Sequence, residues 1–169
     1  VGAGRGNPDR TIEDSSREDC MMTKEYQTIT NTVVLPYRWA LGPTWTRFFD
    51  GLQAEKIYGT RCPTCKKVFV PARAFCPECH ADMDEWTDVA AQGTLTSWTL
   101  VEKSHFGQVR QPPYAVALIR LDGADCDFIH FIGGIDLADP GKVRKKLKAG
   151  IRVKAVWSKE KHADIHDLS

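Results

Sequence analysis

The sequence predicts a mainly β protein that begins with one helix, continues into a small four-cysteine metal ribbon and ends in a five-stranded barrel. Three observations carry this prediction. Four of the six cysteines stand in two C-P-x-C pairs within Cys62–Cys79. An aromatic stripe at helical spacing precedes these pairs. Short apolar segments separated by Gly, Pro and Asp turns follow them.

The composition is that of a soluble globular protein, with 42% apolar residues, 27% charged residues and a net charge of +1. A length of 169 residues allows one ordinary domain and a small appendage. The longest apolar run, Tyr114–Ile119, is much shorter than a membrane span. The N-terminus lacks the apolar stretch of a signal peptide. We therefore expect a cytoplasmic protein without a membrane segment, whose cysteines are reduced.

The first 31 residues are polar and nearly free of large apolar side chains. Such a segment cannot bury enough surface to offset its ordering entropy, so we expect a flexible tail over residues 1–31. The Met21-Met22 pair within it offers a second start for the chain. Residues 32–56 are expected to form an extended arm and then a helix. The arm is predicted because β-branched residues precede Pro36, which interrupts any helix.

The helix is expected from Pro43, which suits a first turn. Four apolar residues then recur at spacings of three and four: Trp45, Phe48, Phe49 and Leu52. The stripe that they form must pack against something, and two alternatives are open. The helix packs on its own domain, or it packs on a partner subunit, because its face is unusually aromatic for its length. Under the second alternative these four residues are candidate partner-binding residues.

Residues 57–85 are predicted to form a zinc ribbon. The spacing C-x2-C…C-x2-C suits one tetrahedral Zn²⁺, and its ligands would be Cys62, Cys65, Cys76 and Cys79. The segment between the pairs would form a hairpin, with Lys67–Val70 as one arm. Disulfides, a redox C-x-x-C site and an iron centre are weaker alternatives. Four thiolates leave no open position for substrate, so the predicted zinc is structural.

Three other potential metal or catalytic residues have simpler interpretations. His80 follows a full set of four ligands, so we expect it at the surface. Cys126 is expected to be a small half-buried residue next to a strand. His130 shares a strand face with apolar neighbours, which predicts a partly buried histidine with its hydrogen bonds satisfied. Four residues along a strand separate Cys126 from His130 by about 13 Å, too far for a nucleophile and its base.

Residues 86–169 contain five short segments that read as strands. The expected strands are Gly93–Val101, Tyr114–Leu121, Asp127–Ile132, Ile151–Trp157 and Ile165–Leu168. Asp139 and Pro140 begin a short helix between the third and fourth strands, and Gly150 ends it. This order matches the five-stranded Greek-key barrel called the OB-fold.

Two parts of the predicted barrel carry candidate substrate- or CoA-binding residues. The loop Glu102–Pro113 contains His105 and Arg110, and it joins the first two strands, where OB-folds often bind ligands. An ordinary surface loop is the alternative. The C-terminal third is strongly basic and includes Arg152 and Lys154, which fit either a solvated face or a phosphate-bearing ligand. Nucleic acid is less favoured, because aromatic residues do not interleave with these charges.

Four segments, in order, carry a resemblance to a known family: WTRFFDGLQAEKIYGTRCPTCKKVFVPARAFCPEC, GTLTSWTLVE, PPYAVALIRLDG and LKAGIRVKAVW. They resemble the OB-fold and zinc-ribbon proteins associated with acyl-CoA enzymes, over about residues 43–169. The resemblance implies a rubredoxin-like ribbon with one structural zinc per chain. It also implies an accessory subunit, not catalytic alone, that docks on a larger thiolase-superfamily subunit in a hetero-oligomer.

The same resemblance implies that the catalytic residues belong to the partner, and that this chain helps to bind CoA or to shape the acyl site. The substrate of the complex would then be an acyl-CoA thioester, with an aromatic or otherwise bulky acyl group. A free single-stranded nucleic-acid-binding OB-fold module is the alternative function.

Overall fold

The computed structural model describes residues 27–29, 35–105, 107–108 and 110–168. The chain divides into two units, residues 1–38 and residues 39–169, and each is considered by itself. The described residues of the first unit have no regular secondary structure and are exposed. The flexible tail expected over residues 1–31 lies outside the described residues except at 27–29. The expected arm is non-helical wherever it is described, up to residue 41.

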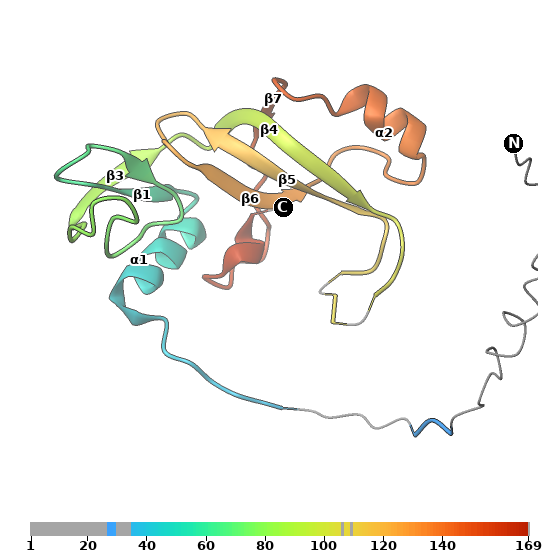
Figure 1. Ribbon diagram of the computed structural model, residues 1–169, viewed down its shortest axis with the longest axis horizontal. Helices are drawn as coiled ribbons and strands as arrows, with labels where there is room; N and C mark the ends of the chain where they lie inside the picture. Colours follow the sequence, from blue (N-terminus) through green and yellow to red (C-terminus); the bar gives the residue numbers. More distant parts are fainter. Residues whose placement is uncertain (1–26, 30–34, 106, 109, 169) are drawn as a thin grey trace, which may run out of the picture. The chain divides into compact units, whose positions relative to one another are not determined.

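The described part of the second unit contains two α-helices, a 3₁₀ helix, a small sheet and a larger sheet (Figure 1). Its elements are α1 (Gly42–Gln53), β1 (Ile57–Arg61), β2 (Val68–Phe69), β3 (Glu85–Val89), β4 (Gln92–Val101), β5 (Tyr114–Leu121), β6 (Asp127–Ile132), α2 (Pro140–Lys146), β7 (Arg152–Lys154) and the 3₁₀ helix η1 (Ile165–Asp167). The small sheet has the order β2-β1-β3, and the larger sheet has the order β6-β5-β4-β7. All pairings are antiparallel. The predicted fold class, a mainly β chain with a helix, a ribbon and an OB-fold, is confirmed.

Helix α1 packs one half of its aromatic stripe on the chain's own core. Its first turn contains Pro43, as expected, and Phe48 and Leu52 are 0% exposed. A Cβ at Gly51 would clash with the ring of Tyr58, so glycine allows α1 to lie close against β1. Trp45 remains 43% exposed. The assignment of Phe48 and Leu52 to a partner is therefore corrected, because both side chains are already enclosed by this chain.

Truncation of Phe48 is expected to destabilise the protein strongly. Removal of a fully buried phenylalanine loses its transfer free energy and leaves a cavity, which together cost about 3–5 kcal/mol. Phe48→Ala should lower the free energy of unfolding by this amount in urea denaturation. Ile129→Ala is the matched control, since Ile129 is 62% exposed and its loss should cost well under about 1 kcal/mol. Equal effects of the two variants would contradict the packing of α1.

The larger sheet forms half of a barrel. Strand β5 lies between β4 and β6, as expected for a central strand, and its inner face buries Ala115, Ala117, Ile119 and Leu121. A shift in register between Leu95 and Ser97 interrupts the pairing of β4 with β5, and such irregularities bend a sheet. The outer face of β5 is open to solvent, because Leu118 and Arg120 are exposed there.

Helix α2 connects β6 to β7 and is shorter than expected. The Asp139 carboxylate caps its start by accepting hydrogen bonds from the N–H groups of Gly141 (2.9 Å) and Lys142 (3.1 Å), which confirms the predicted N-cap. The helix ends at Lys146 and does not continue to Gly150, because the backbone at Leu147 is already extended. The buried side chains of Val143 and Leu147 anchor this segment on the core.

The C-terminal strands differ from the prediction. Strand β7 covers Arg152–Lys154 instead of Ile151–Trp157, and the expected strand Ile165–Leu168 is wrong. The segment forms η1, and a single bridge joins Trp157 to Leu168. Local side-chain hydrogen bonds explain the difference. The buried Asp167 carboxylate accepts from the N–H groups of His162 (2.7 Å) and Ala163 (3.0 Å), which turns the chain.

The ribbon is hydrogen-bonded to the half-barrel through the turn between β5 and β6. The Asp125 N–H donates to the Val68 carbonyl, and the Asp125 carboxylate accepts from the Val68 N–H, both at 2.8 Å. The Cys126 sulfur lies 3.2 Å from both the N and the O of Val70. Cys126 is half-buried, as expected. These contacts fix β2, which begins just after the first cysteine pair, against the larger sheet.

Candidate metal centre and exposed surfaces

The four predicted ligands converge on one point of the ribbon. The sulfur atoms of Cys62, Cys65, Cys76 and Cys79 all lie within 4.8 Å of one another. Cys62 and Cys76 are buried, whereas the other two are partly exposed. In a tetrahedral site with Zn–S bonds of about 2.3 Å, neighbouring sulfurs are about 3.8 Å apart. The sulfurs of Cys65 and Cys76 are 3.8 Å apart, so the cluster fits zinc.

The first pair is held by a tight turn. The Cys62 N–H donates to the Lys67 carbonyl at 2.9 Å, and the Cys62 carbonyl accepts from the Lys66 N–H at 3.0 Å. The Cys65 N–H points to the Cys62 sulfur at 3.4 Å. Lys66 has φ +62°, which closes the turn. The chain then enters β2 within the segment Lys67–Val70 that was expected to form one arm.

The second pair repeats this geometry. The Cys76 N–H donates to the Ala81 carbonyl at 2.8 Å, and the Cys76 carbonyl accepts from the His80 N–H at 2.9 Å. The Cys79 N–H points to the Cys76 sulfur at 3.4 Å. His80 occupies the left-handed position, with φ +57°, that Lys66 occupies in the first turn. Its side chain is exposed and outside the cluster, which confirms the expectation of a surface residue.

The pKa values of the clustered cysteines differ. Burial raises the pKa of Cys62, but hydrogen bonds from the N–H groups of Cys65 and Thr64 outweigh it and lower the pKa to about 6. The hydrogen bond with Cys65, together with burial, raises the pKa of Cys79 to about 12. The Lys67 N–H lowers the pKa of Cys65, but burial and the Cys62 sulfur outweigh it, so that pKa is raised. A dication must therefore displace protons from this cluster.

Zinc uptake by the metal-free protein is expected to release at least two protons per metal at pH 7.5. Cys65 and Cys79, whose pKa values are raised, must lose protons to bind as thiolates. Calorimetric titrations in buffers of different ionisation enthalpy measure the number released. The apparent zinc affinity should accordingly fall as the pH is lowered. A binding enthalpy that does not depend on the buffer would contradict this prediction.

A second candidate site is the apolar surface around the start of α1. Trp39, Leu41, Trp45 and Phe49 line a hollow of about 270 Å³, and Trp39 is 78% exposed. A neighbouring hollow of about 570 Å³ shares Leu41 and Trp45 and continues along Pro71–Phe75 of the ribbon. We call the two hollows together the α1 surface. Trp45 and Phe49 were predicted to face a partner, whereas Trp39 and Phe75 were not predicted as surface residues of this kind.

Phe75 extends the α1 surface to the metal centre, because it directly precedes the ligand Cys76 and is 60% exposed. The tryptophan of the segment YRWAL lies just before the expected helix, and this position could have predicted that Trp39 joins the same surface. Sequence patterns do not show that two segments about thirty residues apart share one surface, since that follows only from the docking of α1 on β1.

The four predicted ligand-binding residues fall in different surroundings. The Arg110 guanidinium lies 4.9 Å from the ring centroid of Phe131, and Arg110 and Lys154 line one cavity. His105 is exposed, and its backbone N–H donates to the Gln108 side chain at 2.6 Å. The structure brings Arg110 and Lys154 together, and neither His105 nor Arg152 lines that cavity.

Arg152 is already paired within the sheet. Its guanidinium donates to both oxygens of Asp122 and to the Thr94 hydroxyl, the latter at 3.0 Å. The Arg152 guanidinium lowers the pKa of Asp122, and the carboxylate raises the pKa of Arg152. The pair therefore connects β7 to the turn after β5.

The comparisons with known proteins agree with this architecture. Residues 49–85 match the model for the rubredoxin-like zinc ribbon domain of ChsH2, and residues 86–158 match the model for its C-terminal OB-fold domain. The two matches are adjacent and cover most of the chain. The protein belongs to the DUF35/ChsH2 family of zinc-ribbon and OB-fold chains.

Two solved structures have the same fold. A DUF35-family protein of unknown function from Sulfolobus solfataricus is 26% identical, with a TM-score of 0.52, covering 68% of this chain and 78% of that chain. An Ltp2-ChsH2(DUF35) aldolase chain is 23% identical, with a TM-score of 0.56, covering 78% of this chain and 94% of that chain. In the part of this chain that is described, no helix is long and apolar enough to cross a membrane.

Proposed function

We propose that this chain is a zinc-binding accessory subunit of a larger thiolase-superfamily enzyme that acts on acyl-CoA. It is not catalytic alone; it is needed for assembly, and it helps to bind CoA or to shape the acyl site. The observation that carries the proposal is the α1 surface. Large exposed aromatic side chains around an apolar hollow are typical of anchor residues in protein interfaces.

The solved relatives support a partner of this kind. One similar solved structure is that of an Ltp2-ChsH2(DUF35) aldolase. The sequence resemblance likewise implies a subunit that docks on a larger thiolase-superfamily enzyme. A chain of this family with an uncovered aromatic surface is therefore expected to bind the catalytic subunit of such an enzyme.

The chemistry of the described residues also fits an accessory role. The four clustered thiolates would saturate a tetrahedral zinc, which leaves no position for substrate. The Cys126 sulfur is engaged by the backbone of Val70. His130 is partly buried, as predicted, and its ring nitrogens lie 3.3 Å from the Phe131 carbonyl and 3.2 Å from the Ile165 carbonyl, so its N–H has a backbone acceptor in either tautomer. Neither residue is poised as a nucleophile or as its base.

A narrower assignment concerns the substrate. We propose that the partner degrades an aromatic or otherwise bulky acyl-CoA in the cytoplasm. The small subunit of benzoylsuccinyl-CoA thiolase is the specific candidate that the sequence resembles. The support for this step is the sequence resemblance.

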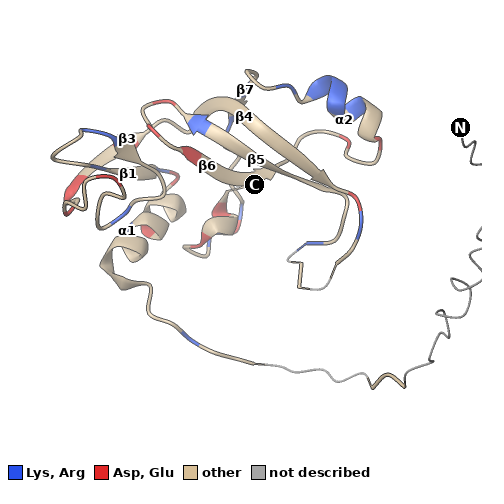
Figure 2. Ribbon diagram, viewed as in Figure 1, with Lys and Arg blue, Asp and Glu red and all other residues tan. Residues whose placement is uncertain are grey.

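The basic helix α2 favours the second candidate, a free nucleic-acid-binding module. Figure 2 shows Lys and Arg gathered on α2, and its last turn contains Arg144, Lys145 and Lys146. These three residues are exposed and flank the buried Val143, so a solvated helix face explains them as well.

The salt dependence of nucleic-acid binding distinguishes the nucleic-acid-binding module from the accessory subunit. A binding module should shift single-stranded oligonucleotides in gels at low salt, and the shift should weaken steeply with added salt.

Affinity purification of the full-length tagged chain from its native host tests the proposal. Mass spectrometry should identify a larger acyl-CoA enzyme in stoichiometric amount, and the purified complex should turn over an acyl-CoA. Turnover of acyl-CoA by the isolated chain would contradict the accessory role. Recovery of nucleic acid without an enzyme would favour the alternative.

A further inference from the structure

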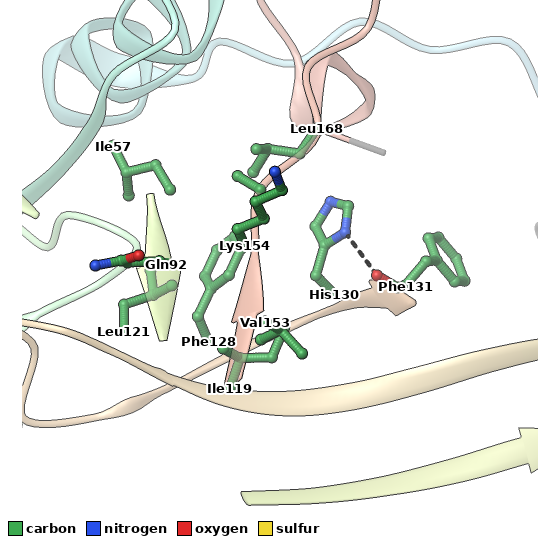
Figure 3. A pocket seen from close by; sticks show the side chains of 11 residues that line it. Ile57, Gln92, Ile119, Leu121, Phe128, His130, Phe131, Val153, Lys154 and Leu168 are labelled. Atoms are coloured by element: carbon green, nitrogen blue, oxygen red, sulfur yellow. Dashed lines mark hydrogen bonds between the residues drawn. The ribbon is translucent and has the colours of Figure 1, made fainter. Parts of the chain in front are cut away.

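The open side of the half-barrel contains a cavity of about 440 Å³. Its walls come from the end of β6, the following Gly133-Gly134 turn, β7 and Arg110 of the loop before β5. A smaller hollow of about 50 Å³ adjoins it and shares Ile119, Phe131, Val153 and Lys154. Figure 3 shows this smaller hollow, where Lys154 extends from β7 and Phe131 lies at the end of β6.

The two cations at this cavity differ from three other basic residues of the second unit, which already form ion pairs. Arg152 is paired with Asp122, Arg120 with Asp127 and Lys161 with Glu55. Among the described residues, no carboxylate pairs with Arg110 or Lys154, and no carboxylate lines the cavity. The guanidinium of Arg110 lies over the Phe131 ring at 4.9 Å, which holds it beside the opening. The cavity therefore presents positive charge without a neutralising partner.

The remaining walls are apolar. Ile119, Ile132, Val153 and Val156 line the cavity with Phe131, and neither glycine of the turn places a side chain in it. Its volume lies in the range of about 300–1,000 Å³ that is typical of small-molecule pockets. Apolar walls with a few converging polar groups are the usual composition of such pockets.

We infer that this cavity binds an anion carried on an apolar chain or ring. Arg110 and Lys154 hold the carboxylate or phosphate, and the apolar part lies against Ile119, Ile132 and Val153. The anion has two sources, a free carboxylic acid or the phosphates of a CoA thioester. The inference deepens the proposed function and rests on it for the CoA source, because it names the cavity and the ligand class by which this chain would help to bind CoA or the acyl group.

Titration calorimetry on the zinc-loaded full chain tests the inference with four probes: octanoate, octanoyl-CoA, CoA and octanol. If a carboxylate is the recognised anion, octanoate should bind at least about tenfold more tightly than octanoyl-CoA, whose acyl group is a thioester without a free carboxylate. Octanoyl-CoA should bind and octanoate should not if the phosphates are recognised. Octanol, which has no charge, should bind at least about tenfold more weakly than the preferred anion. Absence of binding by both anions, or equal binding of octanol, would overturn the inference.

Charge-removing variants separate this cavity from general attraction to a basic protein. Arg110→Gln and Lys154→Gln should each weaken the preferred probe about tenfold. Arg144→Gln is the matched control, because it removes one exposed cation from α2, outside the cavity, and should leave binding unchanged. Equal weakening by all three variants would show non-specific attraction and overturn the inference. Association with the partner enzyme is measured separately, so failure here leaves the proposed function standing.

Discussion

Replacement of Cys62 with serine should abolish stoichiometric zinc binding and, with it, association with the partner enzyme. Cys62 is fully buried, and its sulfur has the lowest pKa among the cysteines with a resolved shift, so it is the first thiolate available to a metal. Structural zinc in small ribbons contributes about 10–16 kcal/mol of apparent binding free energy at neutral pH. A ribbon with three thiolates should lose most of this stabilisation.

The effect should reach the α1 surface because the metal holds part of it. Pro71–Phe75 lies between the two cysteine pairs and forms one side of the larger hollow. Ala72 is buried in the main core and Arg73 is bonded to the Thr60 hydroxyl, so loss of the metal should mainly loosen the end of the segment next to Cys76, where Phe75 lies. Cys79→Ser should have the same two consequences. Zinc per chain and capture of the partner should fall together in metal analysis and pull-down assays.

Cys126→Ser is the matched control for both ligand variants. Cys126 packs beside the ribbon but lies outside the cluster, and a hydroxyl can keep its hydrogen bonds to Val70. This variant should retain one zinc per chain and normal capture of the partner. If the Cys62→Ser protein lost zinc but still formed a fully active complex, the ribbon would not be needed for assembly.

Loss of the two exposed tryptophans should abolish partner binding without unfolding the chain. Trp39 is 78% exposed and Trp45 is 43% exposed, and both line the same hollow. Truncation of one anchor tryptophan in an interface typically costs about 2–4 kcal/mol, which corresponds to about 30-fold or more in affinity. Trp39→Ala combined with Trp45→Ala should therefore weaken association by at least about 100-fold.

The folded state should tolerate these changes better than it tolerates changes in the core. Trp39 makes no aromatic pair among the described residues, whereas Trp45 contacts Phe48 and Phe49 at ring distances of 6.1 and 5.5 Å. Trp39→Ala alone should leave the melting temperature unchanged. A loss of association in this variant would therefore come from the interface and not from a less stable fold. Ile129→Ala removes another exposed apolar side chain, on β6, and should not affect association. Equal losses of association in Ile129→Ala and the double variant would contradict docking at the α1 surface.

The metal centre was predictable from the sequence because its geometry is local. Two C-P-x-C turns at hairpin spacing specify the four ligands without knowledge of the rest of the fold. The helix was also predictable from the spacing of Trp45, Phe48, Phe49 and Leu52. The division of that stripe was not, because only the docking of α1 on β1 decides that Phe48 is enclosed and Trp45 is left at the surface.

The missed strand shows how local chemistry overrides a pattern. Residues Ile165–Leu168 begin and end with an apolar side chain and were expected to form a short strand. Instead, the carboxylates of Asp164 and Asp167 accept hydrogen bonds from nearby backbone N–H groups and form a turn. The cavity between Arg110 and Lys154 was not predictable as a unit. The two residues lie far apart in the chain and meet only because β4 pairs with both β5 and β7.

The most direct test of the accessory role is acyl-CoA turnover by the captured complex, measured with and without this chain. The isolated zinc-loaded chain should be inactive. The catalytic subunit should lose activity when this chain is removed, regain it with the wild-type chain and fail to regain it with the Trp39→Ala, Trp45→Ala variant. Full activity of the catalytic subunit without this chain, or turnover by this chain alone, would contradict the account.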